Sequence, residues 1–261
     1  MKGILITVIL TIVSTLSFAQ KTSKDSIIEP FKIEDRLISG LDIPRLKLKA
    51  HPEREYYQKN IYKGPELSVY ILSSETALNE INNFPIDEFV YYINGRADIE
   101  TKDSTKLTFY SGDYLFVPKG FSGNWTNNGG NKLHLELSVI SNKRGDSTKT
   151  SIAKNPFLLD QELLSGIGLT KHNSTTYKNI IYSGVELDVF TEAEIPTKKE
   201  ISENKKEQFI HILNGSLTIR PINSQPQTYY KGDFFILPKG FSGSWEVEGQ
   251  RLLRILKVIS K

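Results

Sequence analysis

"GDYLFVPKGFSGNW", residues Gly112 to Trp125, returns 120 residues later as "GDFFILPKGFSGSW", residues Gly232 to Trp245. Nine of the fourteen positions carry the same residue in both copies. The similarity continues outward, since residues 57–129 align without a gap on residues 177–249. A repeat of this length is too long for a solenoid, so each copy is expected to form a domain of its own.

Each copy has the pattern of short β-strands. Segments rich in β-branched and aromatic residues, such as "ELSVYIL", "EFVYYI" and "LHLELSVI", are separated by Asn-Gly, Ser-Gly-Asp and Lys-Gly breaks. Repeated short strands with such turns favour a sandwich or a barrel. Asn155-Pro156, the segment "FLLDQELLS" and the stop at Gly166 predict one short helix ahead of the second copy.

The first nineteen residues, "MKGILITVILTIVSTLSFA", have the anatomy of a secretory signal peptide: one lysine, an apolar run and small residues before the cleavage site. The apolar run is too short for a spanning helix. We therefore expect cleavage after Ala19, a periplasmic or secreted protein, and no stable membrane insertion afterwards. The chain has no cysteine, which excludes a lipid-modified cysteine and thiol chemistry.

The remaining chain divides into an N-terminal segment (20–44), a first domain (45–141), a polar linker (142–154) and a second domain (155–261). The full chain of 261 residues has 38% hydrophobic and 24% charged residues, so the protein is expected to be globular. Lysines and glutamates alternate in "TKKEISENKKE", and the formal net charge is +3. Nucleic-acid binding needs a patch of one sign, so we expect no nucleic-acid partner. Self-association is left open.

Two motifs in each copy resemble those of the cupin superfamily. "EFVYYING" has a glutamate, six residues and a glycine, and "GDYLFVPKG" has a glycine, five residues, Pro-x-Gly. The longer string Pro-x-Gly-Phe-x-Gly-x-Trp resembles the ureidoglycine aminohydrolase-type cupin group, which includes an ethanolamine-utilisation cupin. The resemblance implies an all-β fold: two tandem cupin (double-stranded β-helix, jelly-roll) barrels with short helices at the start of each unit. It implies little about function, because this fold carries many chemistries.

The metal ligands of the superfamily are missing. Metal-dependent cupins carry His-x-His just before the glutamate and a third histidine three residues after the second motif's last glycine. Here the third histidine is replaced by Gly123 and Gly243. Glu88 keeps the glutamate position, but the second copy has Gln208. The His-x-His positions hold Ile81, Asn82, Asn83 and Phe84 in one copy and Ile201, Ser202, Glu203 and Asn204 in the other. A metal site needs three or four ligands, so we predict no metal and no cofactor.

Histidines elsewhere in the chain do not replace these ligands. Side chains alternate between the two faces of a strand, so His211 lies opposite the face that Gln208 shares with Ile210 and Ile212. His211 is expected at the surface or between the domains. In "KLHLEL", alternation with the leucines directs His134 away from the apolar face.

The candidate ligand pocket lies in the first copy. Glu88 and Tyr92 share the inner face, with Tyr70 as a further candidate, and a hydrogen bond from Tyr92 would offset the cost of burying the carboxylate. Glu88 is also the candidate catalytic acid, its pKa raised by burial. The equivalent positions of the second copy, Gln208 among them, look structural. Trp125 and Trp245 are either core residues or flat walls for a ligand.

Three functions remain open on the sequence. The first is a metal-free protein that binds a small molecule in the first barrel. The second is an enzyme similar to ureidoglycine aminohydrolase, although the family's enzymes use a metal whose ligands are missing here. The third is a structural or interaction module that uses the outer faces of the barrels.

Overall fold

The computed structural model describes residues 28–49, 51–143, 149, 151–249 and 251–261. The expected signal peptide, residues 1–19, lies outside these residues. Among the described residues, no helix is long and apolar enough to cross a membrane.

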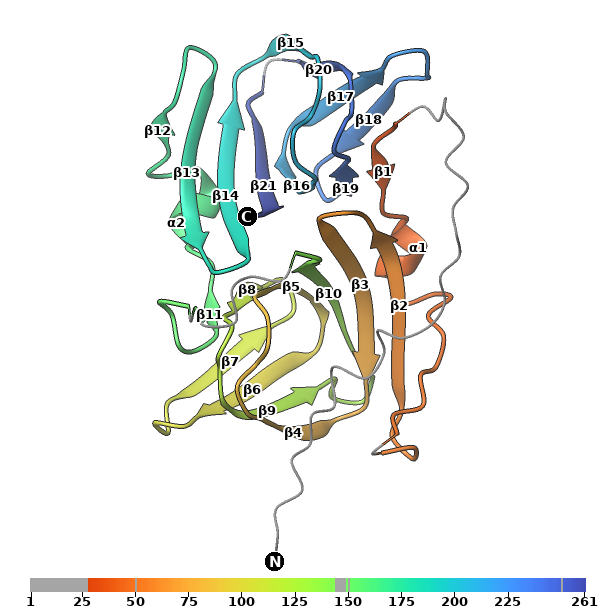
Figure 1. Cartoon of the computed structure of the whole chain (residues 1–261), viewed down its shortest axis with the longest axis vertical. Coiled ribbons are helices and arrows are strands. Elements are labelled where there is room, and N and C mark those ends of the chain that lie inside the picture. The colour runs from red at the N-terminus through yellow and green to blue at the C-terminus, as the bar shows by residue number, and fades with distance from the viewer. Residues whose placement is uncertain (1–27, 50, 144–148, 150, 250) are drawn as a thin grey trace, which may run out of the picture.

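The repeat produces two similar all-β units, one above the other in Figure 1, as the sequence predicts. The strands of the first unit are β2 (Tyr56–Lys63), β3 (Leu67–Ser74), β4 (Ala77–Ile81), β5 (Glu88–Asn94), β6 (Arg96–Thr101), β7 (Lys106–Tyr110), β8 (Tyr114–Val117), β9 (Gly123–Asn128) and β10 (His134–Ser141). Those of the second unit are β12 (Thr170–Lys171), β13 (Thr176–Ser183), β14 (Leu187–Glu194), β15 (Thr197–Ile201), β16 (Gln208–Asn214), β17 (Ser216–Pro221), β18 (Gln227–Tyr230), β19 (Phe234–Leu237), β20 (Gly243–Val247) and β21 (Leu253–Ser260).

Each unit is built from a large and a small antiparallel sheet. In the first unit the large sheet has the order β11-β8-β5-β10-β3-β2, where β11 is Phe157–Leu158, and the small one has the order β4-β9-β6-β7. In the second unit the orders are β1-β19-β16-β21-β14-β13-β12, where β1 is Phe31–Lys32, and β15-β20-β17-β18. The hydrogen bonds of the described strands leave the two sheets of each unit separate, so each barrel is open rather than fully closed.

Two short strands are exchanged between the units. β1 (Phe31–Lys32) precedes the first unit but pairs with β19 of the second, where Phe31 lies opposite Ile236. β11 (Phe157–Leu158) begins the second unit but pairs with β8 of the first, where Phe157 lies opposite Phe116. Each is followed by a short helix, α1 (Asp35–Ile38) or α2 (Gln161–Ser165). Each unit is therefore hydrogen-bonded to the short strand that precedes the other unit in the sequence.

The large sheets are buried on both faces. Phe89 of β5 and Leu137 of β10 point toward the second unit and meet Phe209 and Val258 in a core between the barrels. The alternate residues of the same strands face the interior of their own barrel, where separate cores form in the first and second units. The barrels therefore join through the outer faces of their large sheets, and their inner faces remain available for sites.

The same alternation explains an error about His134. Its side chain is only 1% exposed and lies on the inner face of the first barrel, whereas we expected it to turn away from the apolar face. The neighbouring leucines do define an apolar face, but that face is the one between the barrels. His211 does lie between the units, as expected: it is buried, and its ring stacks on Phe234 at 3.8 Å.

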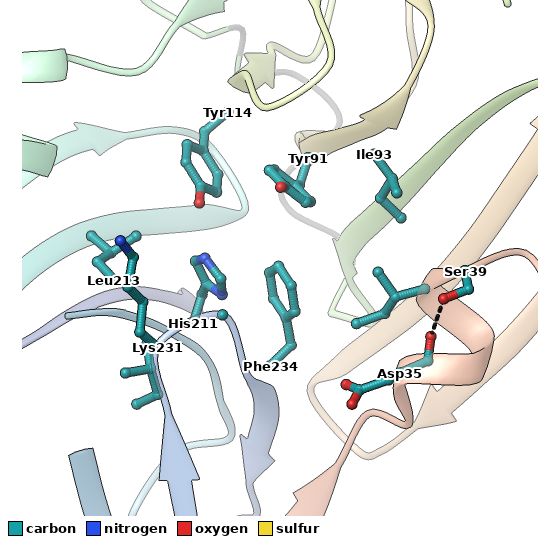
Figure 2. Close-up of a pocket in the computed structure, with 12 residues that line it drawn as sticks. Asp35, Ser39, Tyr91, Ile93, Tyr114, His211, Leu213, Lys231 and Phe234 are labelled. Carbon is teal, nitrogen blue, oxygen red and sulfur yellow. Dashed lines mark hydrogen bonds between the residues drawn. The ribbon is translucent and has the colours of Figure 1, made fainter. Parts of the chain in front are cut away.

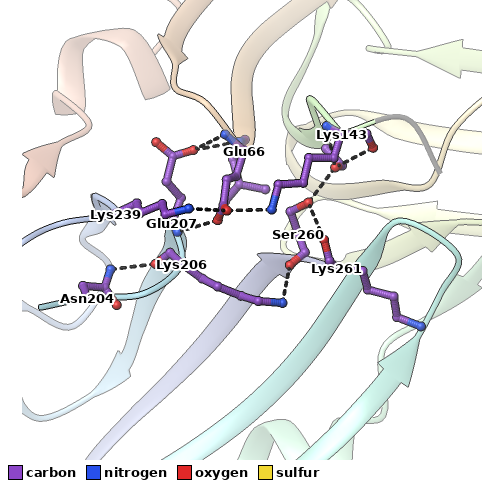
Figure 3. A network of polar contacts seen from close by, with 10 residues as sticks. Glu66, Lys143, Asn204, Lys206, Glu207, Lys239, Ser260 and Lys261 are labelled. Carbon is purple, nitrogen blue, oxygen red and sulfur yellow. Dashed lines mark hydrogen bonds and ion pairs between the residues drawn. The ribbon is translucent and has the colours of Figure 1, made fainter.

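Buried carboxylates cross from one unit to the other (Figure 3). Glu207 Oε2 accepts hydrogen bonds from the backbone N–H groups of Glu66 and Leu67, both at 2.8 Å. In return, Glu66 Oε2 accepts one from the backbone N–H of Glu207 at 2.9 Å, and Lys143 Nζ lies 2.6 Å from Glu66 Oε1. We call the pair Glu66 and Glu207 the inter-barrel clamp.

The equivalent residues of the two copies make the same contacts with the roles of the two units exchanged: Glu186 takes the place of Glu66, and Asp87 that of Glu207. Asp87 Oδ2 accepts a hydrogen bond from the backbone N–H of Glu186 at 2.7 Å, and Glu186 Oε2 accepts one from the backbone N–H of Asp87 at 3.3 Å. A Cβ atom on Gly64 would lie 2.0 Å from Glu207 Oε1, and one on Gly184 would lie 2.3 Å from Asp87 Oδ2. Glycine thus stands at the same place in both copies because the partner's carboxylate approaches the backbone there.

Candidate functional site

The inner face of the first barrel gathers the polar residues of three neighbouring strands. In β5, Glu88 and Tyr92 point inward; in β10, Glu136 lies opposite Tyr92 and Ser138 opposite Val90. β3 continues the face, with Tyr70 opposite Ser138. Tyr70 and Glu88 are only partly buried, so solvent reaches this face although protein surrounds it.

Glu88 lies in this interior without a cationic partner among the described residues. Ser138 donates its hydroxyl to Glu88 Oε1. Burial and the nearby charge of Glu136 raise the pKa of Glu88 from 4.5 to about 7, and the Ser138 hydrogen bond offsets only part of this effect. The two carboxylates therefore repel each other, and below about pH 7 Glu88 holds a proton.

The expected hydrogen bond between Tyr92 and Glu88 is not formed. The Tyr92 hydroxyl instead donates to Asn127 Oδ1 at 2.6 Å, and the Trp125 indole donates to the same oxygen at 2.7 Å. Trp125 is 8% exposed and packs edge-on against Phe121. Its N–H group is thus bonded within the protein, and its ring belongs to the interior core of the first barrel.

His134 and Tyr56 complete the site, and the sequence did not single them out for it. His134 Nδ1 accepts a hydrogen bond from the backbone N–H of Ser74 at 2.9 Å, which leaves the proton on Nε2. His134 Nε2 makes no hydrogen bond and lies 3.5 Å from Glu136 Oε2. Burial and the charges of Glu136 and Glu88 raise the pKa of Tyr56. A bound polar molecule could supply the hydrogen-bond partner that this buried nitrogen lacks in the described chain.

The second barrel has a different inner-face carboxylate, Glu192, and pairs it with two lysines. Lys178 and Lys257 lie 3.0 and 2.8 Å from the two carboxylate oxygens of Glu192. Although burial opposes it, the two lysines lower the pKa of Glu192 to about 2. Lys257 occupies the position of Ser138, and Glu192 that of Leu72. In the aligned copies, Lys257 therefore matches Ser138 on the inner face. The comparison of motifs did not consider this difference between the two copies.

The predicted pocket residues of the second barrel, Gln208 and Trp245, make hydrogen bonds within the protein. Gln208 donates from Nε2 to Asn204 Oδ1 at 2.7 Å. Trp245, 2% exposed, donates from its indole to Glu194 Oε2 at 2.8 Å, and Lys199 lies over its ring at 4.9 Å. The predicted pocket residues thus fall into two groups: Glu88, Tyr92, Trp125 and Tyr70 in one barrel, and Gln208 and Trp245 in the other.

The residues do not fit the metal that the fold family implies. Among the described residues, no three histidine, aspartate or glutamate side chains are placed to share an ion. A Cβ atom at Gly123 would lie 2.6 Å from the carbonyl oxygen of Glu100, so a histidine has no room there without a backbone shift. The missing imidazole leaves no open space at Gly123, because the backbone of β6 fills it.

The comparisons with known proteins agree with this fold. Residues 78–129 and 196–250 match the EutQ-like cupin domain family. The structure is similar to a Cupin 2 conserved barrel domain protein from Leptotrichia buccalis, with a TM-score of 0.58 and 13% identity over 91% of this chain and 99% of that one. It is also similar to a putative glyoxylate-induced protein from Pseudomonas aeruginosa, with a TM-score of 0.58 and 14% identity over 92% of each chain.

A third similar structure is a salicylate 1,2-dioxygenase from Pseudaminobacter salicylatoxidans, with a TM-score of 0.59 and 12% identity over 94% of this chain and 87% of that one. No curated relative matches the chain in sequence. At these identities the structural likeness shows the fold alone. The two matched segments lie one in each unit, and the structural likeness shows that the two units together have the fold of tandem cupin barrels.

Proposed function

We propose that this protein binds a small organic cation, such as an ammonium or guanidinium compound, inside the first barrel. One observation carries the proposal: Glu88 and Glu136 share the inner face without a lysine or arginine partner among the described residues, and burial together with the Glu136 charge raises the pKa of Glu88 to about 7. In the second barrel, the inner-face carboxylate of Glu192 is paired with Lys178 and Lys257. A bound cation would supply in the first barrel what these lysines supply in the second.

The ligand's contacts follow from the site. Its cationic group would lie between Glu88 and Glu136, and the free Nε2–H of His134 would meet an acceptor on the same ligand or on a water molecule. Because Trp125 and Tyr92 already donate to Asn127, they hold the wall in place rather than bond the ligand. A ligand that needs the carboxylate charge binds more tightly as the pH rises through about 7.

A melting-shift screen at pH 8 tests the proposal with small ammonium and guanidinium compounds, sugars, ureides, small carboxylates, Mn²⁺ and Zn²⁺. We expect only the cationic compounds to raise Tm, with an increase that grows with the logarithm of concentration. Glu88→Gln should abolish the shift. The matched exposed variant Glu162→Gln should leave it unchanged. A shift by carboxylates or sugars that Glu88→Gln does not alter would contradict the proposal, and a saturable shift by either metal would overturn the metal-free assignment.

A second candidate function is an enzyme similar to ureidoglycine aminohydrolase, which acts on a small ureido or amino compound. The raised pKa of Glu88 favours it, because a carboxyl group that titrates near pH 7 suits general acid–base catalysis. Incubation of the protein with ureido compounds separates the two functions. Ammonia release that Glu88→Gln abolishes would support the enzyme, and binding without turnover would support the binding protein.

Export is part of the proposal and rests on residues 1–19 alone. In a Gram-negative host, we expect the mature protein in the periplasmic or culture fraction with Gln20 as its first residue. N-terminal sequencing of the purified protein checks this. A chain that still begins at Met1 and stays in the cytosolic fraction would rule out export.

A further inference from the structure

A cleft of about 420 Å³ lies between the two barrels, outside the interior site (Figure 2). Three parts of the chain line it: helix α1, strands β5 and β8 of the first unit, and β16 with the start of β19 in the second. None of the first-barrel site residues lines it. The cleft exists only because the units pack together, and its volume is within the range of small-molecule pockets.

Aromatic rings form its centre. Tyr91 and Tyr114 stack with ring centres 4.8 Å apart and planes 25° apart. His211 and Phe234 form a second, flatter stack at 3.8 Å and 16°. The two pairs meet where Tyr114 and His211 lie 5.7 Å apart. Figure 2 shows these rings facing one another across the cleft. Such walls favour a planar aromatic guest over a flexible aliphatic one.

Polar groups at the cleft are open to a ligand. Tyr91 and Tyr114 are half-buried, and their hydroxyl groups make no hydrogen bond to the described residues and are not buried. His211 Nδ1 lies 3.2 Å from the carbonyl oxygen of Asp233, so Nδ1 donates and Nε2 remains as an acceptor. Burial lowers the pKa of His211 to about 4, so the ring is neutral at pH 7.

The charges at the cleft lie at opposite ends. Lys231, which is exposed and forms no ion pair with a described residue, lies on the side of His211 away from Phe234 in Figure 2. Asp35 of α1 lies beyond Phe234. The cleft therefore offers a positive charge at the Lys231 side and hydroxyl donors from the two tyrosines, which suit an anionic group.

We propose that the inter-barrel cleft binds a small planar aromatic acid, with its ring among Tyr114, His211 and Phe234 and its acidic group toward Lys231. This site is independent of the first-barrel site and takes a ligand of opposite charge. The tyrosine hydroxyls donate to the acid, and the ring displaces water from the aromatic walls.

Ligand-observed NMR and calorimetry with benzoate test the proposal, with cyclohexanecarboxylate and benzylamine as comparisons. We expect saturable benzoate binding, weaker binding of the non-planar acid, and no competition by benzylamine. Lys231→Glu should weaken benzoate binding about fivefold, because an exposed attraction becomes a repulsion. Tyr114→Phe keeps the ring but removes a donor, and should weaken it by roughly three- to tenfold.

Two control variants establish whether benzoate binds in this cleft rather than elsewhere on the protein. Lys132→Glu changes another exposed lysine that has no ion pair with the described residues, and should leave benzoate binding unchanged. Glu88→Gln should also leave it unchanged, so the failure of one site does not imply the failure of the other. The proposal is overturned by no saturable benzoate binding below roughly 10 mM, or by binding that neither Lys231→Glu nor Tyr114→Phe alters.

Discussion

Glu207→Ala is expected to lower the free energy of unfolding by about 3–5 kcal/mol, the largest effect expected of any single substitution in this protein's clamp or site. The Glu207 carboxylate accepts hydrogen bonds from the backbone N–H groups of Glu66 and Leu67 at 2.8 Å (Figure 3). It also accepts one from the Tyr62 hydroxyl at 2.5 Å. Glu207 is 1% exposed. Its removal leaves three donors without an acceptor at the junction of the barrels, and each buried unsatisfied group costs about 1–3 kcal/mol.

Urea unfolding measures this effect, with Glu203→Ala as the control. Glu203 is exposed and pairs only with the exposed Lys205 in the described chain, so its loss should cost under about 0.5 kcal/mol. A cost below about 1 kcal/mol for Glu207→Ala would show that the clamp does not hold the barrels together.

Glu88→Gln is expected to stabilise the ligand-free protein at pH 8, and the gain should vanish below about pH 4.5. Burial raises the pKa of Glu88 in the folded chain to about 7, against an ordinary value of 4.5. Between these values the folded state holds a proton that the unfolded state has lost, so the wild-type protein loses stability as the pH rises from 4.5 to 7. Glutamine carries no charge and still accepts the Ser138 hydrogen bond. The gain at pH 8 is about 1–3 kcal/mol.

Thermal or urea unfolding of both proteins at pH 4 and pH 8 measures the difference. The second copy already carries this substitution, since Gln208 stands at the position of Glu88. A carboxylate kept at the cost of stability is typical of a functional site. If the two proteins differ by the same amount at both pH values, Glu88 does not titrate near pH 7, and the electrostatic basis of the proposed site is lost.

The repeated string and strand alternation predicted much of this protein. The frame of Gly112 to Trp125 predicted two cupin barrels, and alternation correctly directed Glu88 and Tyr92 inward and His211 outward. These predictions succeed because a two-residue side-chain period is a local property of a strand.

The features that the sequence did not predict depend largely on contacts between the two units or between strands far apart in the chain. The exchanged strands β1 and β11 are two residues long, and no local pattern reveals strands of that length. His134 was misplaced because both faces of β10 are buried, and its leucines mark the face between the barrels. Glu136 was missed for the same reason. The lysines that neutralise Glu192 come from strands far apart in the chain.

Carbon-13 NMR titration of the glutamate side-chain carboxyl groups tests the binding site most directly, with and without a small ammonium compound. We predict one glutamate carboxyl that titrates near pH 7, is absent from Glu88→Gln, and shifts to lower pH when the ammonium compound binds, because a cation favours the charged form. Titration of every glutamate carboxyl below about pH 5.5, or a signal near pH 7 that the ammonium compound does not move, would contradict a cation site at Glu88.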